Sequence, residues 1–243
     1  MNLIPGGIYY IMIQVKNYFE DFLHLFFPHN CIGCGTDVLN NEDFLCAQCF
    51  TQLPETNFLS KPGNPVERIF YGRLPVEHAG SAFYFNKDSL LQNLIIQFKY
   101  RSNQTAAIYL GKILGNLLCG ATRFNNIDII VPLPLNKKKE FKRGYNQASL
   151  LATGVAQILN KPLVEHAVER IQFTETQTHK NRITRWQTME GVFKVADESL
   201  LKNKHILLID DIVTTGATLE SCGAAILEVE NTKLSICTLA YTI

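Results

Sequence analysis

HILLIDDIVTTGATLESCGAAI, the stretch from His205 to Ile226, decides the fold class of this chain. It begins with the nearly continuous apolar run HILLI, which is typical of a strand covered by helices on both faces. Two aspartates follow, then a loop of small residues and threonines, and then a helical pattern that we expect from Thr218 to Glu230. A buried strand that leads through a short loop into a helix is the unit from which α/β proteins are built.

The same alternation continues through most of the chain on either side of this stretch. Further strands are expected at residues 78–85, 127–135, 162–170, 191–195 and 233–241. Further helices are expected at residues 90–100, 105–119 and 146–159. Helices of this length between strands act as crossover connections, which make the strands parallel. The sequence therefore predicts an α/β fold with a mainly parallel sheet flanked by helices.

Composition narrows the class of protein. The 243 residues are 47% hydrophobic and 19% charged, with a net charge of +1, as in an ordinary soluble globular protein. The first fifteen residues, MNLIPGGIYYIMIQV, are uncharged but are broken by Pro5, Gly6 and Gly7 and are shorter than the roughly 20 residues of a spanning helix. We expect no transmembrane segment and no secretory signal, and hence a cytoplasmic location. The sequence leaves open whether translation starts at Met1 or Met12.

We expect three parts along the chain. Residues 1–60 hold a short amphipathic helix at 16–27, which we expect to pack on its own protein, and a cysteine-rich module. Residues 61–75, KPGNPVERIFYGRLP, are rich in proline and glycine and are interpreted as a linker. Residues 76–243 carry the strand and helix alternation and form the main domain.

The cysteine-rich module has the spacing of a metal site. Two CxxC pairs, Cys31 with Cys34 and Cys46 with Cys49, are separated by eleven residues. Four thiolates in two such turns can bind one tetrahedral zinc ion, and a reducing cytoplasm disfavours disulfides. Four protein ligands leave no open position, so we expect the zinc to be structural. The alternative is a set of reduced structural or redox cysteines.

The two aspartates and the threonine-rich loop indicate a ligand with two kinds of polar group. Asp210 and Asp211 fall at the carboxyl end of a strand, where α/β sheets bind ligands. The loop leads into the start of a helix, whose free amides favour an anion such as a phosphate. Carboxylates accept hydrogen bonds from sugar hydroxyls, so the segment suits a ribose phosphate with a hard cation nearby. The alternative is a solvated acidic pair beside an ordinary helix cap.

LLIDDIVTTGATL, residues 207–219, closely resembles the phosphoribosyl pyrophosphate (PRPP) loop of type I phosphoribosyltransferases. The resemblance implies that Asp210 and Asp211 face the ribose hydroxyls of PRPP. It implies that the loop residues wrap the 5-phosphate, and these are Thr214, Thr215, Gly216, Ala217 and Thr218.

A second resemblance is more specific and covers the chain from about residue 21 to residue 241. The motifs FPHNCIGCG, FKY around Lys99 and VPLPLNKKKEFKRGYNQASLLA are similar to those of ComF-type proteins. That family combines a zinc ribbon with a phosphoribosyltransferase domain, and in some bacteria it is linked to DNA uptake during natural competence. The resemblance implies binding of PRPP with magnesium, and a role beside DNA-uptake machinery.

The resemblance also implies where the pyrophosphate of PRPP would lie. The loop that contains Pro134 and Leu135 follows a strand at the position where type I enzymes bind pyrophosphate. Five cations follow within residues 137–143, and Arg143 is the best candidate for the anion because a guanidinium binds it with two hydrogen bonds. The three consecutive lysines are alternatively a solvated basic loop.

Residues 174–190 are polar and weakly periodic, and they occupy the position of the hood that closes over the reacting centre in type I enzymes. Arg182 and Arg185 are the catalytic candidates within it, together with Arg143.

Two classes of function remain open from the sequence. In the first, an acceptor attacks the ribose C1 of PRPP and pyrophosphate leaves, with positioning and charge neutralisation as the main catalytic effects. In the second, the chain is a non-catalytic module that binds a ribose phosphate or single-stranded DNA. The cysteine module itself is a poor nucleic-acid site, because between Cys31 and Cys49 it contains three acidic residues and no lysine or arginine. The acceptor and the oligomeric state cannot be deduced from the sequence.

Overall fold

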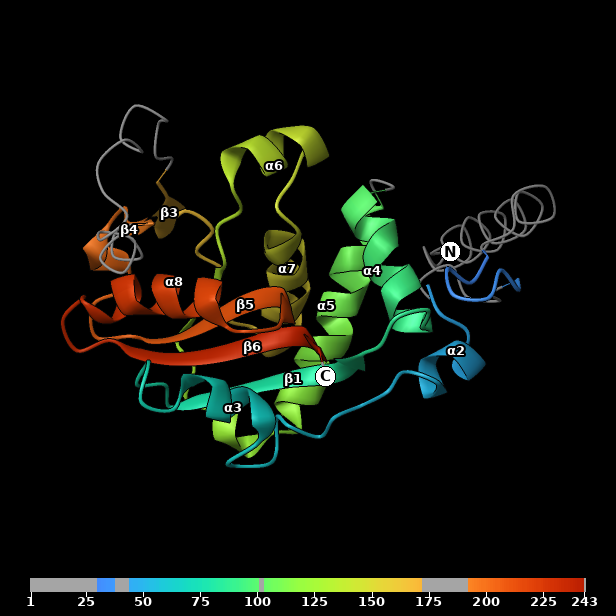
Figure 1. The fold of residues 1–243 in the computed structure, drawn as a ribbon, viewed down its shortest axis with the longest axis horizontal. Coiled ribbons are helices and arrows are strands. Elements are labelled where there is room, and N and C mark those ends of the chain that lie inside the picture. The colour runs from blue at the N-terminus through green and yellow to red at the C-terminus, as the bar shows by residue number, and fades with distance from the viewer. Residues whose placement is uncertain (1–29, 38–43, 101–102, 172–191, 243) are drawn as a thin grey trace, which may run out of the picture. The chain divides into compact units, whose positions relative to one another are not determined.

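A computed structural model describes residues 30–37, 44–100, 103–171 and 192–242 of the chain (Figure 1). The chain divides into two compact units, residues 1–52 and residues 53–243. The helix expected at residues 16–27 lies outside the described residues.

Among its described residues, 30–37 and 44–52, the first unit has few buried side chains. An isolated bridge joins Asn30 to Asp37, and the Ile32 amide donates to the Phe44 carbonyl over 2.9 Å. Helix α2, Ala47–Thr51, follows directly and begins at the N-cap Cys46. Two of the cysteines are among the few buried residues of this unit. Sulfur atoms therefore stand where a larger domain would have a hydrophobic core.

The second unit is built around a four-stranded sheet in the order β1-β6-β5-β2, in which every pairing is parallel (Figure 1). Its strands are β1 at His78–Phe85, β2 at Ile129–Pro132, β5 at His205–Val213 and β6 at Lys233–Thr242. Residues 206–209 of β5 are fully buried, as their apolar run predicts. The predicted α/β fold with a mainly parallel sheet is confirmed.

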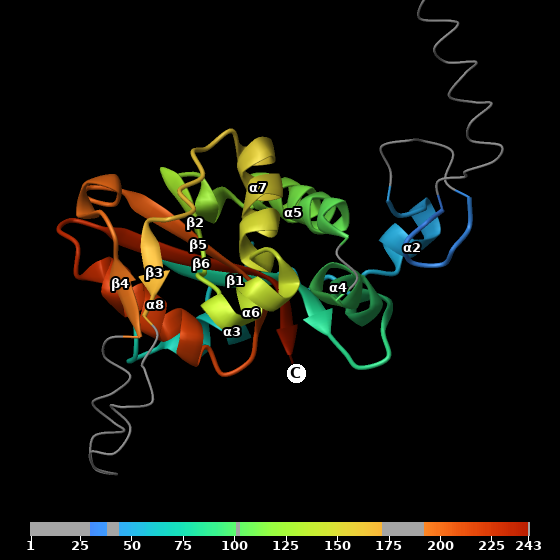
Figure 2. The same ribbon diagram turned by 90° about the horizontal axis from the view of Figure 1, so that it is seen from above.

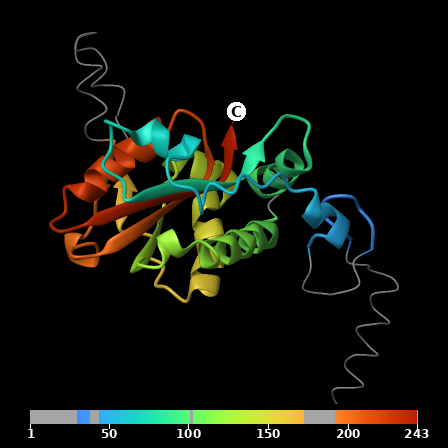
Figure 3. The same cartoon turned by 90° about the horizontal axis from the view of Figure 1, so that it is seen from below.

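Helices cover both faces of this sheet, as Figures 2 and 3 show. On one face lie α5, Gln104–Cys119, and α7, Gln147–Leu159; on the other lie α3, Pro65–Phe70, and α8, Ala217–Leu227. The helices α5 and α7 pack with their backbones nearly touching. A Cβ atom at Gly111 would lie 2.2 Å from the Leu151 carbonyl oxygen, so only glycine fits there.

The linker interpretation of residues 61–75 is wrong. The structure places this segment inside the second unit, where Asn64 caps α3 by accepting from the Val66 and Glu67 amides. Val66 and Phe70 are fully buried against the sheet. The prolines and glycines that suggested a linker flank a single short helix, with Pro65 at its first turn, where proline is well tolerated.

Two of the expected strands form a separate structure. β3, Val168–Arg170, pairs antiparallel with β4, Phe193–Val195, in a two-stranded sheet apart from the parallel one. Both are shorter than expected, because most of residues 162–167 and residue 192 lie outside a strand. The expected hood, residues 174–190, connects this pair and lies outside the described residues.

The remaining elements connect these layers. They are α4 at Leu90–Tyr100, η1 at Thr122–Phe124, α6 at Lys137–Arg143 and η5 at Glu198–Leu200. The basic segment interpreted as a possible solvated loop is thus a helix, capped at its start by Asn136 and ended by Gly144 at φ 81°. Within the described ranges, none of the helices has the length and hydropathy that crossing a membrane requires.

Candidate functional site

The two aspartates lie in the second half of β5, toward the carboxyl edge of the parallel sheet. β5 pairs with β2, and the Leu133 amide donates to the Ile209 carbonyl over 2.8 Å. This bond holds the start of the loop after β2 beside Ile209, the residue before Asp210. The expected pyrophosphate loop, with Pro134 and Leu135, therefore begins beside Ile209, which directly precedes the aspartate pair.

The loop after β5 encloses a small hollow of about 60 Å³. Asp210 and the whole of the expected phosphate loop, residues 214–218, line it. Gly216 is the N-cap of α8 and has φ 73°, so it offers no side chain to cap the helix and its conformation favours glycine. The amides of the first turn of α8 therefore face the hollow with the partial positive charge of a helix start.

Helix α3 packs directly against this loop. A Cβ atom at Gly216 would lie 2.5 Å from Ile69 Cγ2 and 3.1 Å from Phe70 Cε1, so the loop rests directly on α3. Arg73, just after α3, donates from Nη1 to the Thr215 carbonyl over 3.3 Å and pairs through Nη2 with Glu220 in the first turn of α8. The phosphate loop is thus fixed by the segment that the sequence suggested was a linker.

The two carboxylates stand in different environments. Burial raises the pKa of Asp210 well above its ordinary value of 3.8, and the neighbouring Asp211 carboxylate raises it further. The Asp211 amide donates to Asp210 Oδ1 over 2.8 Å. Asp211 Oδ2 lies 2.5 Å from the Lys99 ammonium, at the end of α4, and both side chains are mostly buried. Asp211 is therefore paired directly with the Lys99 ammonium, whereas the buried Asp210 carboxylate lacks such a direct pair among the described residues.

Arg143 lies at the end of α6 and not directly before a helix start, because α7 begins four residues later at Gln147. Its Nη1 donates to Gln147 Oε1 over 2.5 Å, and its guanidinium lies 5.4 Å from the centre of the Tyr100 ring. Tyr100 follows Lys99 in sequence, so the arginine and the Asp211 ion pair approach the same end of α4. Arg182 and Arg185 lie outside the described residues.

Sequence reasoning missed Arg73 and gave Lys99 no role. The sequence did hold a signal for α3, because an Asn-Pro pair is a strong helix start. It held none for the contact of Arg73 with Thr215 or of Lys99 with Asp211, because each joins elements far apart in the chain.

The residues at the sheet edge fit a magnesium ion. Mg²⁺ prefers one or two carboxylates together with the phosphate oxygens of a substrate, and Asp210 and Asp211 supply carboxylate oxygens next to a phosphate-sized hollow. A cation would also relieve the repulsion that raises the pKa of Asp210.

The four cysteines of the first unit fit a zinc ion. The sulfur atoms of Cys31, Cys34, Cys46 and Cys49 all lie within 4.8 Å of one another. Tetrahedral zinc with bonds of about 2.3 Å holds sulfurs about 3.8 Å apart, and the Cys34 and Cys46 sulfurs are 3.7 Å apart.

Their hydrogen bonds favour thiolates as well. The Gly33 and Cys46 amides donate to the Cys31 sulfur over 3.4 and 3.3 Å. The Thr36 hydroxyl and amide lower the pKa of Cys34 to about 6, whereas burial and the neighbouring sulfurs raise the pKa of Cys49. Four thiolates are therefore compatible here only with a cation between them, as a structural metal would supply.

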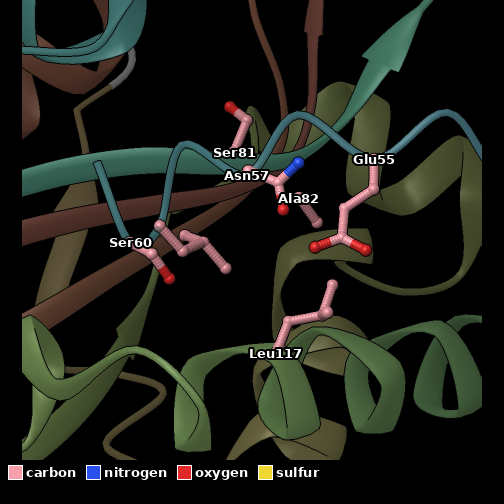
Figure 4. A pocket seen from close by; sticks show the side chains of 7 residues that line it. Glu55, Asn57, Ser60, Ser81, Ala82 and Leu117 are labelled. Carbon is pink, nitrogen blue, oxygen red and sulfur yellow. The ribbon is translucent and has the colours of Figure 1, made fainter.

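A further pocket lies against β1 and carries no chemistry (Figure 4). Glu55, Asn57, Ser60, Ser81 and Leu117 are among its lining residues, and its volume is about 20 Å³. A cavity must hold at least about 10–15 Å³ to take one water molecule, so this one has room for about one.

The chain is similar to known families and proteins. Residues 146–242 match the phosphoribosyl transferase domain family, a range that includes α7, β5, the phosphate loop and α8. The chain is 25% identical over 209 residues to Competence protein F of Haemophilus influenzae, covering 80% of this chain and 89% of that protein. It is 26% identical over 200 residues to DNA utilization protein YhgH of Salmonella typhimurium, covering 81% and 83%.

Competence protein ComFC of Bacillus subtilis is 38% identical over 100 residues, which is 41% of this chain and 38% of that protein. Among solved structures, the chain is similar to the glutamine PRPP amidotransferase of B. subtilis, with a TM-score of 0.43 and 14% identity over 59% of this chain and 30% of that one. It is also similar to a hypoxanthine phosphoribosyltransferase of Staphylococcus aureus, with a TM-score of 0.34 and 17% identity over 56% and 63%.

Proposed function

The chain is a ComF-type member of the phosphoribosyltransferase family, and from that premise we propose that its second unit binds PRPP with magnesium and transfers the phosphoribosyl group to an acceptor. One observation carries the proposal. A carboxylate pair at the end of β5 adjoins a hollow lined by the amide-rich start of α8 and its threonines. A phosphorylated pentose carries the hydroxyls and the phosphate that these two halves would bind.

The geometry gives each group a role. The amides and threonine hydroxyls of residues 214–218 bind the 5-phosphate, and Asp210 and Asp211 accept hydrogen bonds from the ribose hydroxyls. Magnesium, when bound, would screen the charge of the pyrophosphate. The loop of Pro134 and Leu135 orients the leaving group, and Arg143 neutralises charge on it from the end of α6.

The bond between the ribose C1 and the pyrophosphate oxygen breaks, and the electron pair leaves with pyrophosphate. A new bond forms between C1 and the nucleophilic atom of the acceptor. Because this chemistry needs positioning and charge neutralisation rather than a protein nucleophile, the binding groups named above are sufficient for it.

The relatives suggest the setting in which this site works. Two of the relatives are named Competence protein F and DNA utilization protein YhgH. We therefore place the function of this chain beside a DNA-uptake system, with the zinc-bound first unit as the element available to dock a partner protein.

A second candidate function is supported by helix α6. Four lysines of this helix are exposed, and Phe141 between them is 92% exposed to solvent. Tyr100, 71% exposed, lies under Arg143 nearby. Cations with interleaved exposed aromatic rings are the usual means of binding single-stranded nucleic acid, since bases stack on the rings and phosphates pair with the lysines.

Arg143→Ala separates the two candidates. If Arg143 neutralises departing pyrophosphate, its benefit grows as the C1 bond breaks, so the substitution should slow turnover more than it weakens PRPP binding. We expect a loss of about tenfold or more in the rate of pyrophosphate release, or about 1.4 kcal/mol. Pyrophosphate release should be measured with a panel of bases and amines as acceptors, and PRPP affinity by calorimetry.

The same variant should be titrated with single-stranded DNA at several salt concentrations, beside Phe141→Ala and the control Tyr71→Ala, an exposed aromatic next to α3. A wild-type protein that releases no pyrophosphate with any acceptor, but binds DNA in a salt-sensitive way that Arg143→Ala and Phe141→Ala weaken, would favour the second candidate.

A further inference from the structure

The ion pair between Lys99 and Asp211 conflicts with the role of Asp211 in binding a ribose. Lys99 Nζ lies 2.5 Å from Asp211 Oδ2, and their side chains are 18% and 14% exposed. The ammonium occupies one of the roughly four lone-pair sites of this carboxylate and part of the space around it. If PRPP and magnesium bind as proposed above, Lys99 competes with them for Asp211.

The neighbours of Lys99 in the chain are anchored, so the Lys99 side chain is the part that would have to move to release Asp211. Phe98 is fully buried, and its carbonyl accepts from the Tyr145 hydroxyl. Tyr100 stacks with the Arg143 guanidinium at 5.4 Å. Phe98 is therefore anchored to the loop between α6 and α7, and Tyr100 contacts the last residue of α6. The lysine stem is flexible, and its ammonium can move several ångströms while the helix end stays in place.

The charges around Asp210 and Asp211 determine when it is favourable for Lys99 to leave Asp211. Asp210 and Asp211 are adjacent, and the Asp211 amide already donates to Asp210 Oδ1. Removing Lys99 from this pair leaves two carboxylates without a cation in a partly buried place, which costs free energy. A ligand that brings magnesium replaces the lost positive charge, and one that also brings a pyrophosphate offers the ammonium a new anion close by.

Building on the proposed function, we propose that Lys99 is an exchangeable counter-ion of the site. In the free protein it holds Asp211. When PRPP and magnesium bind, it yields this carboxylate to the ribose and moves its ammonium to the pyrophosphate. Lys99 would then be the residue that distinguishes PRPP from a ribose phosphate without pyrophosphate.

Two ligands test this directly. Ribose 5-phosphate and PRPP share the ribose and the 5-phosphate, but only PRPP offers pyrophosphate to the released lysine. Calorimetric titrations with each ligand, in the presence of magnesium, should compare the wild type with Lys99→Met, which keeps the length of the side chain and removes its charge. Lys112→Met, at an exposed lysine of α5, is the matched control.

We expect Lys99→Met to weaken PRPP binding by about tenfold or more and to leave ribose 5-phosphate binding unchanged or tighter. Ribose 5-phosphate gains because Asp211 no longer has to be released from Lys99. Lys112→Met should behave as the wild type with both ligands. Lys99→Arg keeps the charge and should bind PRPP more tightly, relative to ribose 5-phosphate, than Lys99→Met does.

Other results would overturn the inference. Equal losses for both ligands would mean that Lys99 only holds Asp211 in position, and wild-type affinities of Lys99→Met for both ligands would mean that Lys99 does not reach the pyrophosphate. A wild-type protein that binds neither ligand would instead refute the proposed function itself. Melting curves of Lys99→Met and Lys99→Arg show whether each variant is folded, so a loss of binding is not confused with unfolding.

Discussion

The cysteine module and the phosphate loop are both short polar segments with turns of small residues, but they are held in opposite ways. Around Cys31 and Cys46 few of the described side chains of the first unit are buried, and its four sulfurs converge on one point. The loop around Gly216 rests on buried Phe70 and is tied by Arg73. In the cysteine module a bound metal would stabilise the fold, whereas the phosphate loop is held by contacts with the rest of the protein.

This difference predicts how each region responds to change. Loss of the metal should remove the structure of the first unit, because a metal bound by the four cysteines would supply most of its folding free energy. Loss of a ligand should leave the phosphate loop in place, because protein contacts and not the ligand fix its backbone.

The largest effect should come from Cys46→Ser. Structural zinc contributes about 10–16 kcal/mol to small metal-bound domains, so this variant should lose zinc and expose the amides of residues 30–37 and 44–52 to hydrogen exchange. Residues 53–243 should keep their protection, because they have their own core. Cys119→Ser, at an exposed cysteine of α5, should change neither zinc content nor exchange. Wild-type protein without bound metal but with a protected first unit would contradict the zinc assignment.

A smaller effect, of opposite sign, should follow Asp210→Asn. The raised pKa of Asp210 means that the folded protein holds this proton more tightly than the unfolded chain, so stability falls as pH rises above the ordinary value of 3.8. Asparagine cannot ionise, so the variant should not lose this stability and should have a higher melting temperature than the wild type at neutral pH. The difference between the two melting temperatures should shrink toward pH 3. The measurement is the melting temperature against pH.

Asp211→Asn is the control for this gain. It breaks the ion pair with Lys99 and should not be stabilising in the same way. A neutral-pH melting temperature of Asp210→Asn that is equal to or below that of the wild type would contradict the view that the site keeps a destabilising carboxylate for its ligand.

The smallest effect should come from Arg73→Gln. Arg73 touches the phosphate loop only through the Thr215 carbonyl and through Glu220, and it is partly exposed. Removing it should loosen the loop and weaken PRPP binding by about threefold to tenfold, in line with the loss of one or two partly exposed hydrogen bonds. Arg68→Gln, at an exposed arginine of α3 that bonds within its own segment, should bind as the wild type does. Equal losses in both variants would show that α3 acts only through its packing.

The parts of the fold that the sequence predicted are those whose signal is local. The apolar run of β5 and the periodic helices α5 and α7 carry their own pattern of burial. Helix α3 was missed because it is only one and a half turns long and its cap, Asn64, stands among turn residues. The pairing of β3 with β4 was missed because strand propensity does not specify a partner.

The candidate site likewise has parts with a local sequence signal and parts without one. Residues 214–218 and Asp210 belong to one continuous segment, so their common place around one hollow was predictable. The contacts of Arg73 and Lys99 depend on how α3 and α4 pack against the sheet, which local patterns do not contain. Such tertiary contacts decide how the loop is held and which charges meet its ligand.

The central claim is that the start of α8 binds the 5-phosphate of PRPP, and Thr215→Asp tests it most directly. Thr215 is an exposed residue of the hollow, so an aspartate there should repel the phosphate and fill its place without unfolding the protein. Thr105→Asp, at an exposed threonine in the first turn of α5, is the matched control. Calorimetry with PRPP and magnesium should show binding to the wild type and to Thr105→Asp and at least a hundredfold loss in Thr215→Asp, whereas equal affinity in all three proteins would contradict the account.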